Sequence, residues 1–288
     1  MPVIHHLASP SPPLPACTAP WANQLGLRKN PFQDTIDPRL FFRTRQHEEA
    51  VVKLKIGIEE RHALILLDGP SGTGKTLAAQ VVLRSLDRER FTPVFVSVFP
   101  GMGKTALLGA ILAALEVTPA RLASERLIQL QEQARLLVSD GRRLVIVIDE
   151  AHFLAADALH SLRAMSNLET EQEKLVTVLL VAEPGLARRL AAPAHASLRG
   201  RITFAVRLAP LGVEGLEQYV KYRILKCGGD PSRLPPETYG LLHELSRGIP
   251  REINRLLYVA CIEAMTSGQP LGPATIQMAV GRRGSLDG

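Results

Sequence analysis

A glycine-rich octapeptide at residues 69–76 sets the strictest limit on how this chain can fold. It matches the nucleotide-binding P-loop pattern, in which four variable residues separate a first glycine from Gly-Lys-Thr. A short apolar run over residues 63–67 precedes it, and residues 77–83, which favour a helix, follow it. Strand, glycine-rich turn and helix in this order form the context in which the pattern holds phosphate. We therefore predict a site for a nucleoside triphosphate.

The residue types of this octapeptide suit phosphate binding. Glycines let the backbone wrap around an anion, so that exposed amides and the N-terminus of the helix face the phosphates. We expect the Lys75 ammonium to reach the β- and γ-phosphates and the Thr76 hydroxyl to bind Mg²⁺. The residues expected at the nucleotide are Gly69, Pro70, Ser71, Gly72, Thr73, Gly74, Lys75 and Thr76.

Alternating strands and helices are predicted around this turn. Apolar segments predict strands at residues 63–67, 93–98, 144–148, 175–181 and 203–207. Most are nearly continuous apolar runs, which is typical of a parallel sheet covered on both faces. After residue 210 the strand pattern stops, and helices are predicted at residues 214–226, 236–246, 251–265 and 273–280. The fold class is therefore α/β, with a small helical domain after the sheet.

The predicted domain boundaries follow from these patterns and from composition. Residues 1–22 are proline-rich and without periodicity, which indicates a disordered tail. We assign residues 23–210 to the α/β domain, residues 211–282 to the helical domain and residues 283–288 to a short tail.

Two carboxylates end the strand predicted at residues 144–148. In an open α/β sheet the carboxyl ends of the strands face the ligand crevice. Asp149 is expected to support the Mg²⁺ site and Glu150 to activate the attacking water, which favours hydrolysis over binding alone. With Ala151 and His152 they also spell the tetrapeptide of one helicase class. We do not assign the chain to that class, because the same four letters recur in unrelated ATPases.

Charge and cysteine content bear on partners and location. The net charge is +6, but the basic residues are scattered, so we interpret them as a solvated surface first and keep DNA as an alternative partner. No apolar run approaches the roughly 18 residues of a membrane span, and the N-terminus lacks a signal-peptide pattern. Three widely separated cysteines favour a reducing compartment. We predict a cytoplasmic protein.

Further motifs make a resemblance specific. Beside the P-loop they are residues 25–27, 30–32, 37–38, 148–152, 162–170, 198–202 and 248–255, the last reading Gly-Ile-Pro-Arg-Glu-Ile-Asn-Arg. In this order they resemble the AAA+ ATPases of the ExeA/GspA type, which take their name from the general secretion pathway. The resemblance extends from about residue 25 to residue 281. It implies a P-loop NTPase of the AAA+ type, with a five-stranded parallel sheet, flanking helices and a helical lid.

The resemblance also implies roles for single residues. Arg201, or else Arg199, matches the arginine finger, which acts on the ATP of a neighbouring subunit. Arg251 matches the sensor-2 arginine of the lid, and Asn30 and Pro31 are expected near the adenine. ATP with Mg²⁺ and a homo-oligomer, as a ring or a filament, are therefore expected.

One position departs from the family. Glu183 follows the fourth predicted strand, where the family usually has a glutamine that can donate a hydrogen bond. An ionised carboxylate has no proton to donate and repels phosphate. Either a nearby arginine neutralises Glu183, or it helps to hold metal or water, or it turns to solvent, or hydrolysis is slow.

Three functions remain open at this stage. The first is an accessory motor or switch of a secretion, pilus or polysaccharide-export system, which the lead-in over residues 37–42 favours. The second is a DNA-binding regulator that recruits a transposase, which the basic charge favours. The third is a nucleotide-gated scaffold that hydrolyses ATP slowly, which Glu183 suggests.

Overall fold

The computed structural model describes residues 20–33, 37–171 and 173–284 of the chain. These residues form two compact units. The sheet unit comprises residues 46–70 and 75–208, and the helical unit comprises residues 20–33, 37–45, 71–74 and 209–284. Most of the predicted tail over residues 1–22, and residues 285–288, lie outside the described residues. No helix in the described part of the chain has the length and apolar character needed to cross a bilayer.

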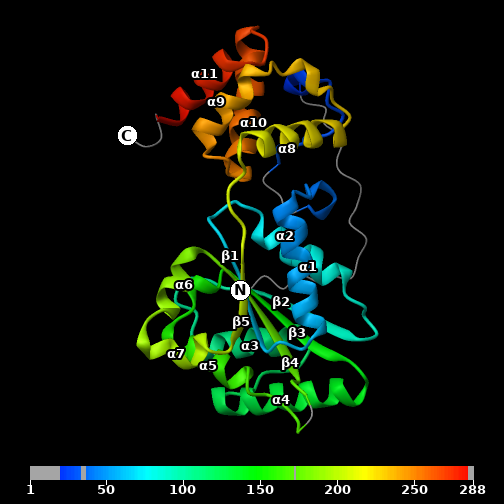
Figure 1. Cartoon of the computed structure of the whole chain (residues 1–288), viewed down its shortest axis with the longest axis vertical. Helices are drawn as coiled ribbons and strands as arrows, with labels where there is room; N and C mark the ends of the chain where they lie inside the picture. The colour runs from blue at the N-terminus through cyan, green and yellow to red at the C-terminus, as the bar shows by residue number, and fades with distance from the viewer. Residues whose placement is uncertain (1–19, 34–36, 172, 285–288) are drawn as a thin grey trace. The chain divides into compact units, whose positions relative to one another are not determined.

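The sheet unit contains the five predicted strands, all parallel, in the order β2-β3-β4-β1-β5 (Figure 1). The strands are β1 (Leu64–Asp68), β2 (Phe91–Ser97), β3 (Arg143–Asp149), β4 (Val176–Ala182) and β5 (Ile202–Arg207). Each begins within two residues of the predicted start, because continuous apolar runs mark strands that are buried on both faces. This confirms the predicted five-stranded parallel sheet.

Helices cover the two faces of this sheet. They are α1 (Arg45–Glu59), α2 (Lys75–Ser85), α3 (Lys104–Ala114), α4 (Ala123–Ser139), α5 (Ala156–Met165), α6 (Pro184–Leu190) and α7 (Ala196–Arg199). Alternate strand residues such as Leu66, Ile146 and Leu180 share one core with α3, α4 and α5. The intervening residues face α1, where a Cβ on Gly57 would touch Ile65. The central strands β3, β4 and β1 are therefore buried almost throughout and present their ends to ligands, whereas the edge strand β5 is partly exposed.

The helical unit is built from α8 (Val213–Lys226), α9 (Glu237–Ser246), α10 (Pro250–Ser267) and α11 (Pro273–Gly284). These match the four predicted helices. Apolar side chains of the 3₁₀ helix η1 (Pro20–Leu25), among them the buried Trp21 and Leu25, complete its core together with Leu27, Phe32 and Leu40. Residues 23–33 and 37–45, which lie in the predicted α/β domain, thus belong to the helical unit, and residues 20–22 of the predicted tail lie in η1.

A close backbone approach joins the start of the helical unit to the turn before α10. The Leu211 N–H donates to the Gly248 carbonyl at 2.8 Å. Gly248 has φ +69°, and a Cβ at this residue would overlap the Leu211 carbonyl oxygen. Glycine is therefore required here both by its backbone conformation and by space.

We predict that Gly248→Ala destabilises the helical unit by roughly 3 kcal/mol or more, because strain and overlap with backbone add. Gly268→Ala is the matched control, since Gly268 has φ +68° with nothing within 4 Å of the added Cβ. It should cost only about 1 kcal/mol of backbone strain. Thermal unfolding measures both, and equal losses would contradict the role of the Leu211 contact.

Candidate functional site

The P-loop lies between the end of β1 and the start of α2. Gly72 and Gly74 have φ values of +77° and +95°, which turn successive backbone amides toward one side of the loop. Lys75 is buried, and its Nζ donates to the Pro70 carbonyl at 2.8 Å. The loop therefore has the curvature and the cation that phosphate binding requires.

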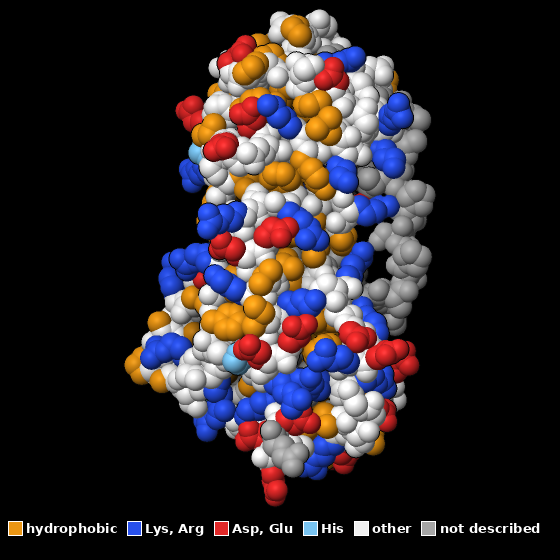
Figure 2. All heavy atoms as spheres, turned by 45° about the vertical axis from the view of Figure 1, so that its right-hand side comes forward, with side chains coloured by type: hydrophobic (Ala, Val, Ile, Leu, Met, Phe, Trp, Pro, Cys, Tyr) orange, Lys and Arg blue, Asp and Glu red, His pale blue; other side chains and the backbone are white. Residues whose placement is uncertain are grey.

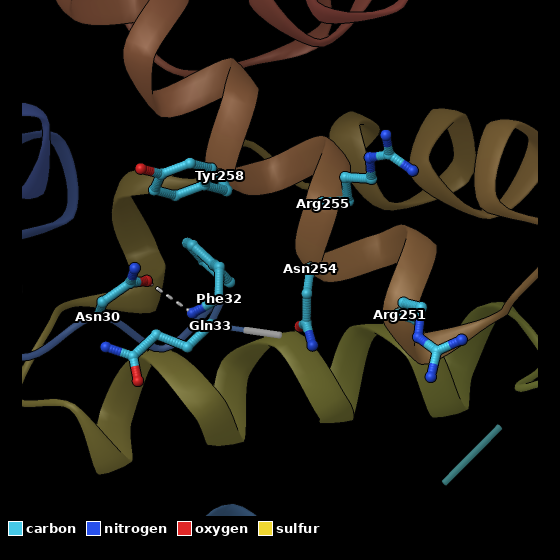
Figure 3. Close-up of a pocket in the computed structure, with 7 residues that line it drawn as sticks. All are labelled: Asn30, Phe32, Gln33, Arg251, Asn254, Arg255 and Tyr258. Atoms are coloured by element: carbon cyan, nitrogen blue, oxygen red, sulfur yellow. Dashed lines mark hydrogen bonds between the residues drawn. The ribbon is translucent and has the colours of Figure 1, made fainter. Parts of the chain in front are cut away.

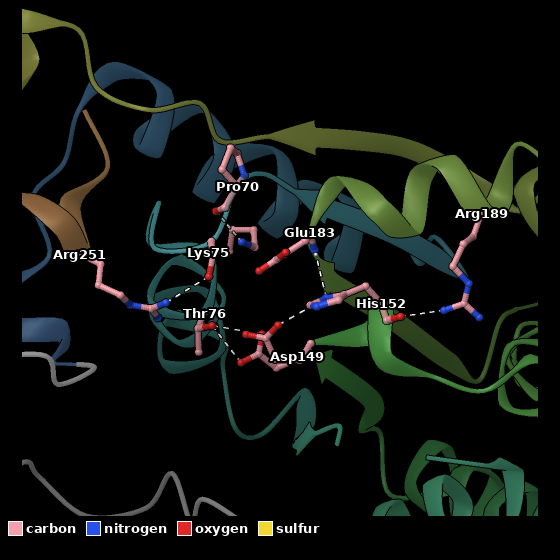
Figure 4. Close-up of polar contacts among 10 residues, drawn as sticks. Pro70, Lys75, Thr76, Asp149, His152, Glu183, Arg189 and Arg251 are labelled. Atoms are coloured by element: carbon pink, nitrogen blue, oxygen red, sulfur yellow. Dashed lines mark hydrogen bonds and ion pairs between the residues drawn. The ribbon is translucent and has the colours of Figure 1, made fainter. Parts of the chain in front are cut away.

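Thr76, in the first turn of α2, meets Asp149 at the end of β3. The Thr76 hydroxyl donates to the Asp149 carboxylate, with 2.9 Å to Oδ2 and 3.2 Å to Oδ1 (Figure 4). The two residues are 73 positions apart in the chain. The structure thus brings the predicted metal-binding hydroxyl and carboxylate together.

Burial dominates the electrostatics of Asp149. Burial raises the pKa of Asp149 to about 6. The Thr76 hydroxyl lowers this pKa, the Glu150 carboxylate raises it, and Lys75 lowers it to a smaller extent. Burial in low dielectric disfavours the charged form, and a divalent cation would reverse this preference.

The donor set fits Mg²⁺. This ion prefers oxygen ligands and is usually held by one or two protein groups together with phosphate oxygens and water. The carboxylate of Asp149 and the hydroxyl of Thr76 supply such oxygens next to the P-loop. Thr76 and Asp149 would hold the ion.

Glu150 follows Asp149 in a left-handed backbone conformation, with φ 57° and ψ 34°. This conformation is uncommon for a residue with a side chain, and such strain concentrates at functional sites. The Glu150 side chain is 39% exposed. It lies in a cluster with His152 and Glu183, whose ligand atoms are all within 4.8 Å of one another. Glu183, at the position where the family usually has a glutamine, therefore stands beside Glu150.

Sequence analysis gave no role to His152 or Arg189. His152 Nδ1 lies 3.4 Å from Glu150 Oε2. Arg189, on α6, donates from Nη1 to the His152 carbonyl at 2.7 Å (Figure 4). Its Nη2 donates to the Leu154 carbonyl at 2.9 Å. The discounted tetrapeptide was a signal for His152, whereas no sequence pattern pointed to Arg189.

Arg199 and Arg201 differ in what they bind. Arg199 Nη1 donates to the Ala191 carbonyl at 2.8 Å, which uses its guanidinium inside the chain. Arg201 precedes β5, and its buried Nε has no hydrogen-bond partner among the described residues. Of the two, Arg201 thus has the side-chain nitrogen that makes no hydrogen bond to a described residue.

Arg251 lies close to the P-loop within the helical unit, which includes residues 71–74. Its Nη1 donates to Ser71 Oγ at 3.1 Å (Figure 4), and its backbone N–H donates to the Gly72 carbonyl at 3.3 Å. A Cβ on Gly72 would stand 2.8 Å from Arg251 Cβ. The glycine therefore permits this close approach.

A pocket of about 430 Å³ opens in the helical unit beside Arg251 (Figure 3). It is lined by Asn30, Phe32, Gln33, Arg251, Asn254, Arg255 and Tyr258. Asn30 Oδ1 accepts from the Phe32 N–H at 2.8 Å, which fixes one wall. Pro31 does not line the pocket; its carbonyl accepts from Arg223 Nε at 2.6 Å. Aromatic rings and amides around one cavity suit a planar polar ligand.

Comparison with known proteins identifies the sheet unit. A family model described as an AAA domain matches residues 58–190. General secretion pathway protein A of Aeromonas hydrophila is 31% identical over 245 residues, which are 84% of this chain and 44% of that protein. The chain thus spans less than half the length of this relative.

Solved structures share the fold. Drosophila ORC bound to DNA superposes with a TM-score of 0.69 at 18% identity, covering 94% of this chain and 70% of that one. The ORC1 protein of Aeropyrum pernix in complex with DNA gives 0.67 at 20% identity, covering 88% and 68%. RuvB, the Holliday junction branch migration motor of Thermotoga maritima, gives 0.53 at 18% identity, covering 82% and 67%. At these identities the likeness concerns the fold.

Proposed function

We propose that this chain binds ATP with Mg²⁺ and hydrolyses the bond between the β- and γ-phosphates, because it is an AAA-type P-loop protein related to general secretion pathway protein A. The observation that carries the proposal is the Thr76–Asp149 hydrogen bond, beside which Glu150 stands at the end of β3. Phosphoryl transfer needs a metal site next to the phosphates and a group that orients the attacking water. These three side chains supply both.

Each chemical role falls to a named atom. Lys75 Nζ and the P-loop amides would hold the phosphate oxygens, and Thr76 and Asp149 would hold the cation. The Glu150 carboxylate accepts a hydrogen bond from the attacking water and orients it toward the γ-phosphate. When bound, Mg²⁺ supplies charge neutralisation of the phosphates.

We assign the pocket of the helical unit to the base and ribose of the nucleotide. Its volume is in the range of small-molecule sites. Arg251 lines the pocket and also contacts Ser71 of the P-loop, so one residue adjoins both. Asn30 offers polar atoms to the base, whereas Pro31 acts through its backbone contact to Arg223. Arg251 would sense the γ-phosphate from α10.

We assign the finger role to Arg201 and infer that the protein acts as a homo-oligomer. Arg201 has a buried Nε without a partner among the described residues, while Arg199 is bound to backbone carbonyls of its own chain. A guanidinium from a neighbouring subunit stabilises charge that develops on the phosphoryl oxygens.

The relative's name guides the proposed pathway. We propose that the chain is a cytoplasmic accessory motor or switch of a secretion or export system, with a protein of that system as partner. A DNA-bound regulator of transposition is the second candidate. The net charge of +6 and the complexes of ORC-type proteins with DNA favour it. On the face shown in Figure 2, however, acidic and basic side chains are interspersed, without a continuous basic stripe.

Glu150→Gln should leave the affinity for an ATP analogue unchanged within about twofold and lower turnover about 100-fold or more, because the amide cannot accept a proton from water. Lys75→Ala is the contrasting variant and should lose binding itself. Fluorescent-analogue titration and phosphate release measure the two steps. Unchanged turnover in Glu150→Gln would remove Glu150 from this role. A wild-type rate near that of the uncatalysed reaction would favour the slow scaffold.

Arg201→Ala should keep nucleotide binding and lose turnover, whereas Arg199→Ala should keep both. Mixing Arg201→Ala with Lys75→Ala should restore part of the activity, since a mixed interface can combine one intact P-loop with one intact arginine. Phosphate release at several mixing ratios measures the rescue. If no ratio gives more than the sum of the separate variants, Arg201 does not act on a neighbour.

Assembly distinguishes the two pathways. Light scattering after size exclusion, with a slowly hydrolysed ATP analogue, should show an oligomer that forms equally with and without duplex DNA at physiological salt. ADP should not support it. An oligomer that requires both the analogue and DNA, and that weakens steeply as salt rises, would favour the transposition regulator instead.

A further inference from the structure

The imidazole of His152 touches the ends of two adjacent strands. Its Nδ1 lies 3.4 Å from Glu150 Oε2, just after β3. The same atom lies 3.4 Å from the backbone nitrogen of Glu183, just after β4, whose N–H points toward it. One ring nitrogen thus stands between the Glu150 carboxylate, which we propose to activate water, and the backbone N–H of Glu183.

This nitrogen cannot form both hydrogen bonds at once. In a neutral imidazole each ring nitrogen either carries a proton or presents a lone pair. With a proton, Nδ1 donates to the Glu150 carboxylate. With a lone pair, it accepts from the Glu183 N–H and repels the carboxylate. Both contacts are longer than a usual hydrogen bond, so a small movement of the ring shortens one and breaks the other.

The backbone that carries His152 is held firmly. Arg189 binds the carbonyls of His152 and Leu154 through separate guanidinium nitrogens, at 2.7 and 2.9 Å. The His152 ring also lies against the Phe153 ring, with centroids 4.1 Å apart. The side chain of His152 is 14% exposed, so water offers little alternative hydrogen bonding. The ring is therefore placed by the turn that Arg189 holds.

We propose that His152 is a positioning residue that directs the Glu150 carboxylate by donating from Nδ1, and that Arg189 keeps it in place. The inference rests on the proposed function, because it concerns the Glu150 carboxylate, which orients the attacking water in that proposal. When Nδ1 instead accepts from the Glu183 N–H, its hydrogen bond to Glu150 is lost. The backbone at the end of β4 thus affects how the Glu150 carboxylate is held. The end of β4 then contributes a donor through its backbone, whichever side chain occupies position 183.

An isosteric pair of substitutions tests the donor. His152→Asn places an amide nitrogen close to the position of Nδ1, whereas His152→Asp has the same shape but only accepts. We expect His152→Ala and His152→Asp to lower kcat about tenfold or more, as small misplacements of reacting groups do. His152→Asn should recover most of kcat. The KM for ATP should stay within about twofold in all three.

Arg189→Ala should lower kcat in the same way, and Arg188→Ala is its control, because Arg188 is the exposed preceding residue on α6. Analogue binding and thermal unfolding verify that each variant is folded. If Glu150→Gln abolishes turnover but His152→Asn and His152→Asp have equal kcat values, the proposed role of His152 is wrong while the proposed function stands. Retained turnover in Glu150→Gln would overturn the proposed function and this inference together.

Discussion

The hydrogen bond between Thr76 and Asp149 depends on the register of three strands. Thr76 follows β1 and Asp149 ends β3, while β4 lies between them. Leu66 of β1 and Ile148 of β3 both align with Leu180 of β4, so the strand ends and the segments after them reach the same edge. A slip of one residue in either pair would turn Asp149 toward the opposite face. The meeting of the two residues that we propose to bind the metal is therefore a consequence of how the apolar strands pack.

This arrangement has an energetic cost that the apolar core offsets. Asp149 is 6% exposed and its pKa is raised to about 6, which means that the ionised carboxylate is destabilised in the folded chain. Glu150 adds a left-handed backbone conformation of the kind that costs about 1–3 kcal/mol. Asp149 and Glu150 are the two residues that follow Ile148, which is fully buried in the continuous core of the sheet. Apolar strands fix the two carboxylates where a cation and a water molecule could bind them. The burial of Asp149 and the left-handed backbone of Glu150 would not persist in a mobile loop.

The sequence could predict what depends on local patterns. Continuous apolar runs located the five strands, and the octapeptide located the phosphate loop, because each signal lies within a few neighbouring residues. The contact of Arg189 with the His152 carbonyl could not be predicted, because it depends on how α6 packs against the turn after β3. The packing of Trp21 and Leu25 in the helical unit was missed because these single apolar residues follow a proline-rich stretch without periodicity. Pocket residues from positions 30–33 and from α10 likewise meet only through tertiary packing.

Arg199 and Arg201 are close in the sequence but differ in their contacts. Arg199 ends the short helix α7 and gives its guanidinium to a backbone carbonyl, which fixes the chain before β5. Two residues later the chain enters the sheet, and Arg201 has a buried Nε with no described acceptor. A buried donor without a partner costs free energy, and the cost would be removed if the side chain moved so that its guanidinium met an acceptor. On our proposal that acceptor is a phosphate at a neighbouring subunit, so the same guanidinium would stabilise assembly and the transferring phosphoryl group. Hydrolysis would then depend on protein concentration, because one subunit alone would lack this cation.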